Sequence, residues 1–154
     1  MRKALLVLAF CGLSASLWAA DPWVGTWKIN LEKSKLAPVG DWVKEMTVTY
    51  REVGDQLTYE AKGTLINGIA FSGKGNRPLA GGFVKREPAD AKGIIDYATV
   101  LEPRDVYLTF LKDGKQIGLE HYVVSKDGKS HTVVVKGMDE KGKPAEALYY
   151  LDKQ

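Results

Sequence analysis

His121 is the side chain with the clearest chemical potential in this sequence, which contains only 2 histidines. Desolvation keeps a histidine among apolar neighbours neutral, and a neutral imidazole can act as a base near neutral pH. The alternative is a core histidine that is hydrogen bonded to Tyr149, Thr132 or the backbone. His121 is therefore a candidate catalytic base, although a structural role is the commoner one for such a residue.

Three hydroxyl groups could join His121 in a binding site, and they belong to Tyr97, Thr132 and Tyr149. Small-molecule sites are mostly apolar and contain a few well-placed polar groups. We therefore predict that these four side chains line an interior and contact a ligand. The alternative for the two tyrosines is a position in the core or at the rim, with the hydroxyl group at the wet end of a barrel.

We expect no metal centre in this chain. A two-residue turn at residues 127–128 would place His121 and His131 on opposite faces of a hairpin. Neither histidine has a second candidate ligand at a recognisable spacing. We accordingly predict no metal ion and no other cofactor.

Short strands must position these residues. Turn signals recur along the chain and the segments between them alternate, which is typical of an all-β sandwich or barrel. Asn-Gly or Asp-Gly pairs at 67–68, 113–114 and 127–128 supply the positive φ angles that two-residue hairpin turns require. The strands predicted are Trp23–Asn30, Val43–Arg51, Gln56–Thr64, Ile69–Gly73, Gly82–Arg86, Ile94–Leu101, Asp105–Leu111, Gln116–Ser125, Ser130–Gly137 and Ala145–Asp152.

Pairing across the last hairpins assigns the two faces of these strands. A two-residue loop at 113–114 places Phe110 opposite Ile117, and a four-residue loop is expected at 139–142. The predicted inner face contains Tyr97, Val106, Leu108, Ile117, Leu119, His121, Val123, Thr132, Val134, Ala147, Tyr149 and Leu151. The predicted outer face contains Tyr107, Glu120, Tyr122 and His131. A slip of one residue at any turn would exchange the faces beyond it.

The stretch Val24–Lys35 reads Val-Gly-Thr-Trp-Lys-Ile-Asn-Leu-Glu-Lys-Ser-Lys. Its Gly-x-Trp motif, Gly25 to Trp27, resembles the opening of lipocalin-like barrels, in which the tryptophan closes one end. The longer string resembles small exported bacterial proteins that have a lipocalin-like domain and no assigned activity. The resemblance implies an all-β, antiparallel up-and-down, lipocalin-like β-barrel of about 8–10 strands, whose interior is filled or holds one small ligand.

One detail of this resemblance concerns a charged residue. Lipocalins often place an arginine near the last strands, where it stacks on the opening tryptophan, and this chain has no arginine after Arg104.

Independently of the resemblance, Arg77 and Arg104 belong to a group of cations that could form a basic rim for an anionic ligand. Acidic residues lie close to this group in the sequence, so solvated salt bridges are the default interpretation.

The pattern of charges and apolar residues at 1–20 predicts a secretory signal peptide, and residues 21–154 are expected to form one domain. Arg2 and Lys3 precede an uncharged apolar run, and the small residues Ala19 and Ala20 follow it. The run is shorter than the ~20 residues that cross a bilayer. We therefore predict a periplasmic or secreted protein without stable membrane insertion, cleaved after Ala19 or Ala20.

The single cysteine, Cys11, would be lost with this peptide. The mature chain would then contain no disulfide, thiol nucleophile or thiolate metal site. Lipid attachment at Cys11 is the alternative, but Phe10 occupies a position where a small residue is required. The net charge is +3 and includes Arg2 and Lys3, so residues 21–154 are nearly neutral and do not predict a nucleic-acid partner.

Three classes of function fit this sequence. The first is an exported barrel that binds a small apolar or amphipathic molecule. The second is a structural or interaction module of the cell envelope, with a filled interior and an exposed apolar patch. The third is a lyase, isomerase or hydrolase that uses His121 as a base. The sequence favours the first class, and it leaves the ligand and the oligomeric state open.

Overall fold

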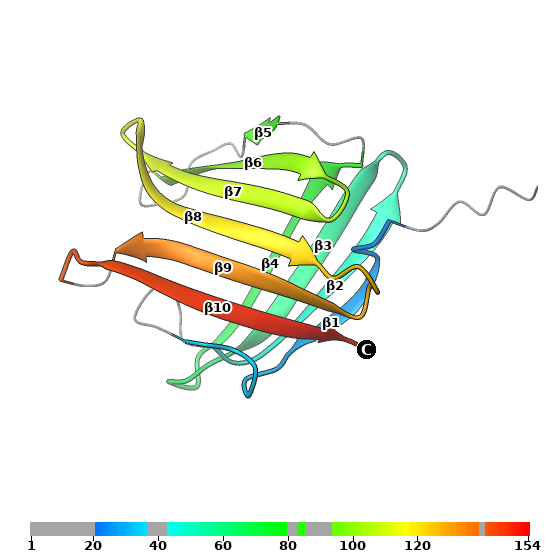
Figure 1. Ribbon diagram of the computed structural model, residues 1–154, viewed down its shortest axis with the longest axis horizontal. Helices are drawn as coiled ribbons and strands as arrows, with labels where there is room; N and C mark the ends of the chain where they lie inside the picture. Colours follow the sequence, from blue (N-terminus) through cyan, green and yellow to red (C-terminus); the bar gives the residue numbers. More distant parts are fainter. Residues whose placement is uncertain (1–20, 37–42, 80–82, 86–93, 139–140) are drawn as a thin grey trace, which may run out of the picture.

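Ten antiparallel strands form a single sheet, which confirms the all-β, up-and-down barrel expected from the sequence. The computed structural model describes residues 21–36, 43–79, 83–85, 94–138 and 141–154, with side chains described outside 80–101. Within these ranges, no helix is long and apolar enough to cross a lipid bilayer. The strands in Figure 1 are β1 (Gly25–Ile29), β2 (Val43–Val53), β3 (Gln56–Leu65), β4 (Ala70–Pro78), β5 (Phe83–Lys85), β6 (Ile94–Glu102), β7 (Asp105–Lys112), β8 (Lys115–Val124), β9 (Ser130–Met138) and β10 (Pro144–Lys153).

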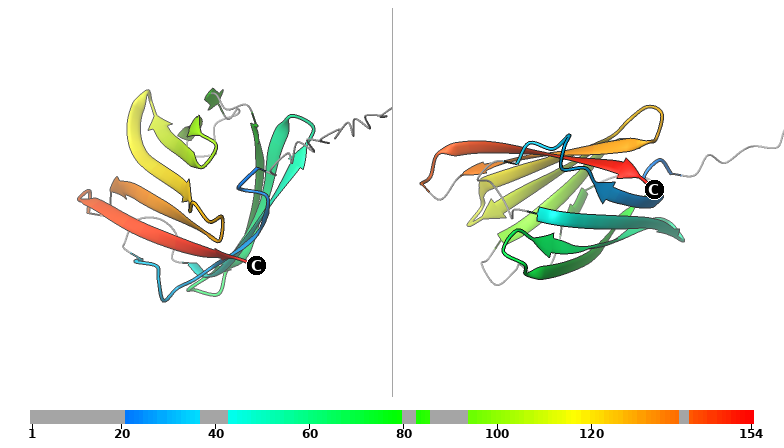
Figure 2. Two further views of the ribbon diagram at one scale, coloured as in Figure 1. Left: turned by 45° about the vertical axis from the view of Figure 1, so that its right-hand side comes forward. Right: turned by 90° about the horizontal axis from the view of Figure 1, so that it is seen from below.

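The sheet is curled so that its two halves share one interior. The strand order is β4-β3-β2-β1-β10-β9-β8-β7-β6-β5, in which β1 pairs with β10 and the sheet ends at β4 and β5. Figure 2 shows that β2–β4 face β7–β10 across this interior. Residues on alternate positions of each strand therefore point either into the interior or to the outside.

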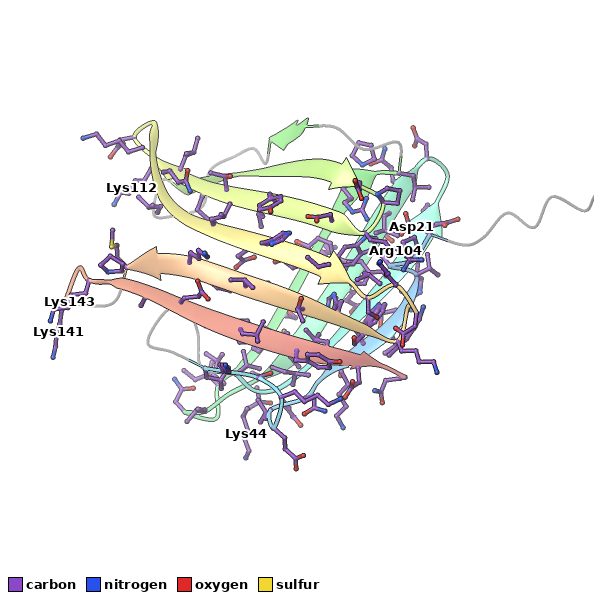
Figure 3. All side chains as sticks on the ribbon, viewed as in Figure 1. Asp21, Lys44, Arg104, Lys112, Lys141 and Lys143 are labelled. Carbon is purple, nitrogen blue, oxygen red and sulfur yellow. The ribbon has the colours of Figure 1, made fainter. Side chains whose placement is uncertain are left out.

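The two ends of the barrel carry different residues. Figure 3 shows Asp21 and Arg104 at one end and Lys112 and Lys143 at the opposite end. We call the first the tryptophan end, because Trp23 lies there, and the second the lysine end. The difference matters because the polar groups of the interior lie towards the tryptophan end.

A tightly buried layer closes the tryptophan end. Trp27 and Leu151 are completely buried there. The indole Nε1 of Trp27 donates a hydrogen bond of 2.8 Å to the Trp23 carbonyl oxygen, and the Trp23 Nε1 donates one of 2.7 Å to the Pro103 carbonyl oxygen. Each indole thus buries a large apolar area while its N–H group stays hydrogen bonded. This arrangement fits the interpretation of Trp27 as the plug of the barrel.

A lysine occupies the place of the arginine that the lipocalin resemblance implies. Lys153 lies opposite Trp27 in the β1–β10 ladder, and its Nζ is 5.0 Å from the centroid of the Trp27 ring. A cation at this distance is attracted by the face of the indole. Gly25 allows the lysine to cross, since a Cβ at that residue would lie 2.6 Å from the Lys153 Cε. Gly25 also has a φ of 133°, which L side chains rarely adopt.

The register of the β7–β8 hairpin differs from the prediction by one residue. The turn contains Asp113 and Gly114 with positive φ angles, as expected. However, Phe110 lies opposite Gly118 and not Ile117, because Ile117 is the extra residue of a β-bulge. A Cβ at Gly118 would lie 3.4 Å from the Phe110 ring, so the glycine makes room for this pairing. The bulge exchanges the inner and outer faces of β8.

A second one-residue difference restores the predicted faces of β10. The 127–128 turn pairs Val124 with His131 as predicted, so the exchange continues into β9. The loop before β10 is one residue longer than expected and pairs Met138 with Pro144. The faces predicted for β8 and β9 are therefore wrong, whereas Ala147, Tyr149 and Leu151 point inward as predicted.

Candidate functional site

A cavity of about 430 Å³ lies between the two halves of the curled sheet. β2, β3 and β4 form one wall, and β7, β8, β9 and β10 form the other. The interior is therefore not filled, in contrast to the expectation for a purely structural module. The lining residues are Trp23, Val43, Met46, Val48, Tyr50, Leu57, Tyr59, Ala61, Leu65, Phe71, Asn76, Arg77, Val106, Leu108, Glu120, Tyr122, His131, Val133, Val135, Tyr149 and Leu151.

Polar and apolar lining residues occupy different levels of the cavity. Towards the lysine end the lining is apolar and includes Met46, Leu65 and Phe71. Towards the tryptophan end, Tyr50 pairs with Tyr59, and Arg77 lies one inward position further along β4. On the opposite wall the polar residues of this level come from β8 and β9. We call this level the polar layer and define it by Tyr50, Tyr59, Arg77, Glu120, Tyr122 and His131.

Two tyrosines of the polar layer, Tyr50 and Tyr122, keep their protons. The Tyr122 hydroxyl donates a hydrogen bond to Glu120 Oε2. Burial raises the pKa of Tyr122 well above its usual value, and the negative charge of Glu120 adds to this shift. Burial also raises the pKa of Tyr50, with contributions from Tyr59 and Glu120 that Arg77 opposes. Both hydroxyl groups are therefore neutral donors at all physiological pH values.

Arg77 is a buried cation with little direct pairing. The residue is 9% exposed, and its Cζ lies 5.6 Å from the centroid of the Trp23 ring. The nearest carboxylate oxygen, Asp21 Oδ1, is 4.0 Å from Nη2. Nη2 has no hydrogen-bond partner among the described residues. Burial lowers the pKa of Arg77 and the Asp21 charge counters that shift, but a guanidinium remains protonated at neutral pH.

His131 is a buried, neutral imidazole inside an aromatic box. It is 1% exposed and stacks on Trp27 at a centroid distance of 4.9 Å. The rings of Trp23 and Tyr50 meet it edge-on at 5.5 and 6.3 Å. Burial lowers the pKa of His131 to about 4, which keeps the ring uncharged at neutral pH. Neither ring nitrogen has a hydrogen-bond partner among the described residues.

The structure brings one of the predicted site residues, Tyr149, into the cavity. The backbone of Tyr97 lies in β6 opposite Lys85 and Thr109, and its side chain is outside the described residues. The inward orientations predicted for His121 and Thr132 are wrong, because the bulge in β8 turns both residues to the outer face.

The outward side chain of His121 has partners of its own. Its Nε2 is 2.7 Å from Asp105 Oδ1, and its ring stacks on Tyr107 at 4.0 Å. Catalysis by His121 as a base inside the barrel would require the opposite orientation. In the part of the chain that is described, no three histidine, cysteine, aspartate or glutamate side chains are grouped to hold a metal ion.

Sequence reasoning missed most of the polar layer. Glu120, Tyr122 and His131 were placed outside by the same register error, and Arg77 was assigned to solvated salt bridges. The glycine that follows Ile117 is a signal for the bulge, because an isolated glycine in a strand often marks one. Arg77 had no such signal, since its burial depends on the pairing of β4 with β3.

No family model matches this chain, and no curated protein matches it. Among solved structures, it is similar to a zebrafish ileal bile acid-binding protein complexed with cholic acid, with a TM-score of 0.55 and 13% identity over 86% of this chain and 99% of that one. It is also similar to Rv2717c from M. tuberculosis, with a TM-score of 0.53 and 20% identity over 92% and 99%. As-p18, an extracellular fatty acid binding protein, gives a TM-score of 0.50 and 16% identity over 87% and 97%.

Lobster apocrustacyanin A1 is a longer protein, of which the chain covers 63%, with a TM-score of 0.46. At these identities the comparisons establish the barrel fold that the chain shares with the first three structures.

Proposed function

We propose that this chain is an exported lipocalin-like barrel that binds one small amphipathic molecule in its interior. The observation that carries the proposal is the cavity of about 430 Å³ with an apolar lining and a separate polar layer. Ligand sites are typically cavities of roughly 300–1,000 Å³ with mainly apolar walls and a few polar groups that fix orientation. Export rests on the composition of residues 1–20, which is that of a secretory signal peptide.

The distribution of the lining residues sets the orientation of the ligand. Met46, Leu65 and Phe71 offer apolar contact towards the lysine end. Tyr50 and Arg77 offer hydrogen-bond donors towards the tryptophan end. Burial of a polar group is costly without a hydrogen bond, so the polar end of the ligand lies in the polar layer and its apolar end points towards the lysine end.

Two of the similar structures support this class of ligand. One is complexed with cholic acid, and the other is named as a fatty acid binding protein. Both ligands combine an apolar skeleton with a polar group. The third class of function, catalysis by His121, lacks such support because His121 lies on the outer face.

Blocking the cavity tests the proposal. Ala61 lines the cavity on β3, and its neighbour Lys62 points outward on the same strand. Ala61→Trp should fill the space and weaken the binding of the neutral dye Nile red by at least about tenfold, which corresponds to 1.4 kcal/mol. Lys62→Trp is the matched control and should bind the dye as the wild type does.

Circular dichroism of both variants should show that the barrel remains folded. Saturable binding that is equal in the wild type, Ala61→Trp and Lys62→Trp would contradict the proposal, because it would place the dye outside the cavity. Absence of any saturable binding to the wild type would contradict it as well.

A further inference from the structure

Three buried polar atoms are left without hydrogen-bond partners in the described side chains, and all three belong to the cavity lining. They are Arg77 Nη2, His131 Nδ1 and His131 Nε2. Both residues are more than nine-tenths buried. Buried polar groups in folded proteins are nearly always hydrogen bonded, so each exception needs a physical explanation. A ligand in the cavity can supply the missing partner to both residues.

Arg77 and His131 lie near the same indole, that of Trp23, and come from opposite walls of the barrel. Arg77 comes from β4 and lies with its Cζ 5.6 Å from the centroid of the Trp23 ring. His131 comes from β9 and lies with its ring centroid 5.5 Å from the same indole. The two side chains therefore both lie next to Trp23 in the lining of one cavity.

The one positive charge at this level already has two negative charges near it. Arg77 carries the positive charge, Asp21 Oδ1 lies 4.0 Å from its Nη2, and Glu120 lines the same cavity. The charges of Arg77 and Glu120 act in opposite directions on the Tyr50 hydroxyl, which places both within electrostatic reach of it. His131 contributes no charge at neutral pH. An additional carboxylate here would be a buried anion without a cation of its own, which is strongly unfavourable.

Resting on the binding function proposed above, we infer that the polar end of the ligand is an uncharged oxygen group, a hydroxyl or a carbonyl, held between Arg77 and His131. A hydroxyl oxygen accepts from Arg77 Nη2 and donates its proton to the unprotonated nitrogen of His131. A carbonyl oxygen accepts from Arg77 and from the N–H of the neutral imidazole. The ligand class is therefore neutral amphipathic molecules, such as long-chain alcohols, sterols or long-chain ketones.

Competition between head groups on one tail tests this inference. The full chain, purified after export, is loaded with Nile red and titrated at pH 7.5 with dodecan-1-ol, dodecanoate or dodecylammonium. Dodecan-1-ol should displace the dye at a concentration at least about tenfold lower than dodecanoate, the effect of leaving one charged group unpaired. Equal or tighter binding of dodecanoate or of dodecylammonium would overturn the inference while leaving the binding function intact. If Nile red itself fails to bind, the binding function fails first.

Two variants assign the effect to the two residues. Arg77→Met and His131→Phe each remove a hydrogen-bonding group and keep most of the volume. Relative to the Nile red affinity of the same variant, each should weaken the binding of dodecan-1-ol by about tenfold. His121→Phe is the matched control, since it removes the same imidazole from the outer face.

The dye reports whether each variant retains a folded cavity, so that unfolding cannot be mistaken for loss of the alcohol site. Full dodecan-1-ol affinity in both Arg77→Met and His131→Phe would overturn the inference.

Discussion

The two histidines of this chain lie on adjacent strands, yet their surroundings have almost nothing in common. His121, on the outer face of β8, has a side chain that is 27% exposed and pairs with Asp105 at 2.7 Å. His131, on the inner face of β9, is surrounded by aromatic rings and has no hydrogen-bond partner among the described residues. On the outer face His121 is paired with a neighbouring carboxylate, whereas on the inner face both ring nitrogens of His131 lack a partner among the described residues.

The outer faces of the two halves of the sheet also differ. Alternation places Thr47, Arg51 and Lys62 on the outside of β2 and β3. It places Leu119 and Val134 on the outside of β8 and β9. Strands with apolar residues on both faces do not reveal their orientation through hydrophobic periodicity. The inner and outer faces of β8 and β9 must therefore be distinguished by experiments that compare matched positions.

The largest difference between inner and outer face should appear in stability. Trp27→Ala removes the completely buried plug and should lower the free energy of unfolding by about 3–5 kcal/mol. Val134→Ala, on the outer face of β9, should lower it by no more than about 1 kcal/mol. Urea unfolding followed by circular dichroism measures both, and similar losses would contradict the assignment of faces.

The pH dependence of stability should come from the inner histidine. The folded-state pKa of His131 is about 4, below the value of about 6.5 for an exposed histidine. Between these values the unfolded chain binds more protons than the folded one, so stability is complete above pH 6.5 and falls as the pH decreases towards 4. The loss attributable to His131 should be on the order of 3 kcal/mol.

Urea midpoints of the wild type, His131→Phe and His121→Phe at pH 7.5 and 4.5 isolate this contribution. His131→Phe should reduce the decrease in stability between the two pH values, whereas His121→Phe should leave most of it in place. Equal pH dependence in the wild type and His131→Phe would show that this imidazole is not buried in its neutral form.

A smaller effect should follow from the contact at the tryptophan end. Gly25→Ala forces an unfavourable φ and brings a Cβ within 2.6 Å of the Lys153 side chain, so it should cost about 1–2 kcal/mol. Lys153→Met keeps the apolar stem and should cost about 0.5–1 kcal/mol through loss of the cation–π contact with Trp27. Lys153→Ala removes the Cε that the new Cβ would meet. If it abolishes most of the Gly25→Ala effect, the clash with Lys153 accounts for that effect; additive losses would point to the φ angle alone.

The smallest effect is expected on the outer face. Asp105→Asn weakens the interaction with His121, which is partly exposed and screened by solvent. It should therefore change the free energy of unfolding by less than about 1 kcal/mol and leave Nile red affinity unchanged. A loss of dye binding in this variant would show that the outer face and the cavity are coupled.

The sequence was sufficient to predict most strands, most turns and the fold class, because Asn-Gly and Asp-Gly pairs determine hairpins locally. The strand predicted at Ile69–Gly73 continues to Pro78 as β4, so the prediction left Arg77 outside it. The sequence was not sufficient for the faces of β8 and β9. The extra residue Ile117 becomes visible only when Phe110 is paired with Gly118 across the hairpin. The length of the loop before Pro144 is likewise set by pairing between strands, and not by a local turn signal.

The candidate site was less predictable than the fold. Tyr149 was identified correctly as a cavity residue because the two register errors cancel before β10. Arg77 and His131 gain their significance from burial on opposite walls, which no local pattern encodes. Residues that act through such long-range contacts can be identified only once the strands are assembled into the barrel.

Native mass spectrometry with dodecan-1-ol tests the central claim, that the interior holds one amphipathic molecule, most directly. We expect one bound alcohol per wild-type chain, released on denaturation, and none on Ala61→Trp. Several bound molecules per chain, or the same occupancy in Ala61→Trp as in the wild type, would contradict it.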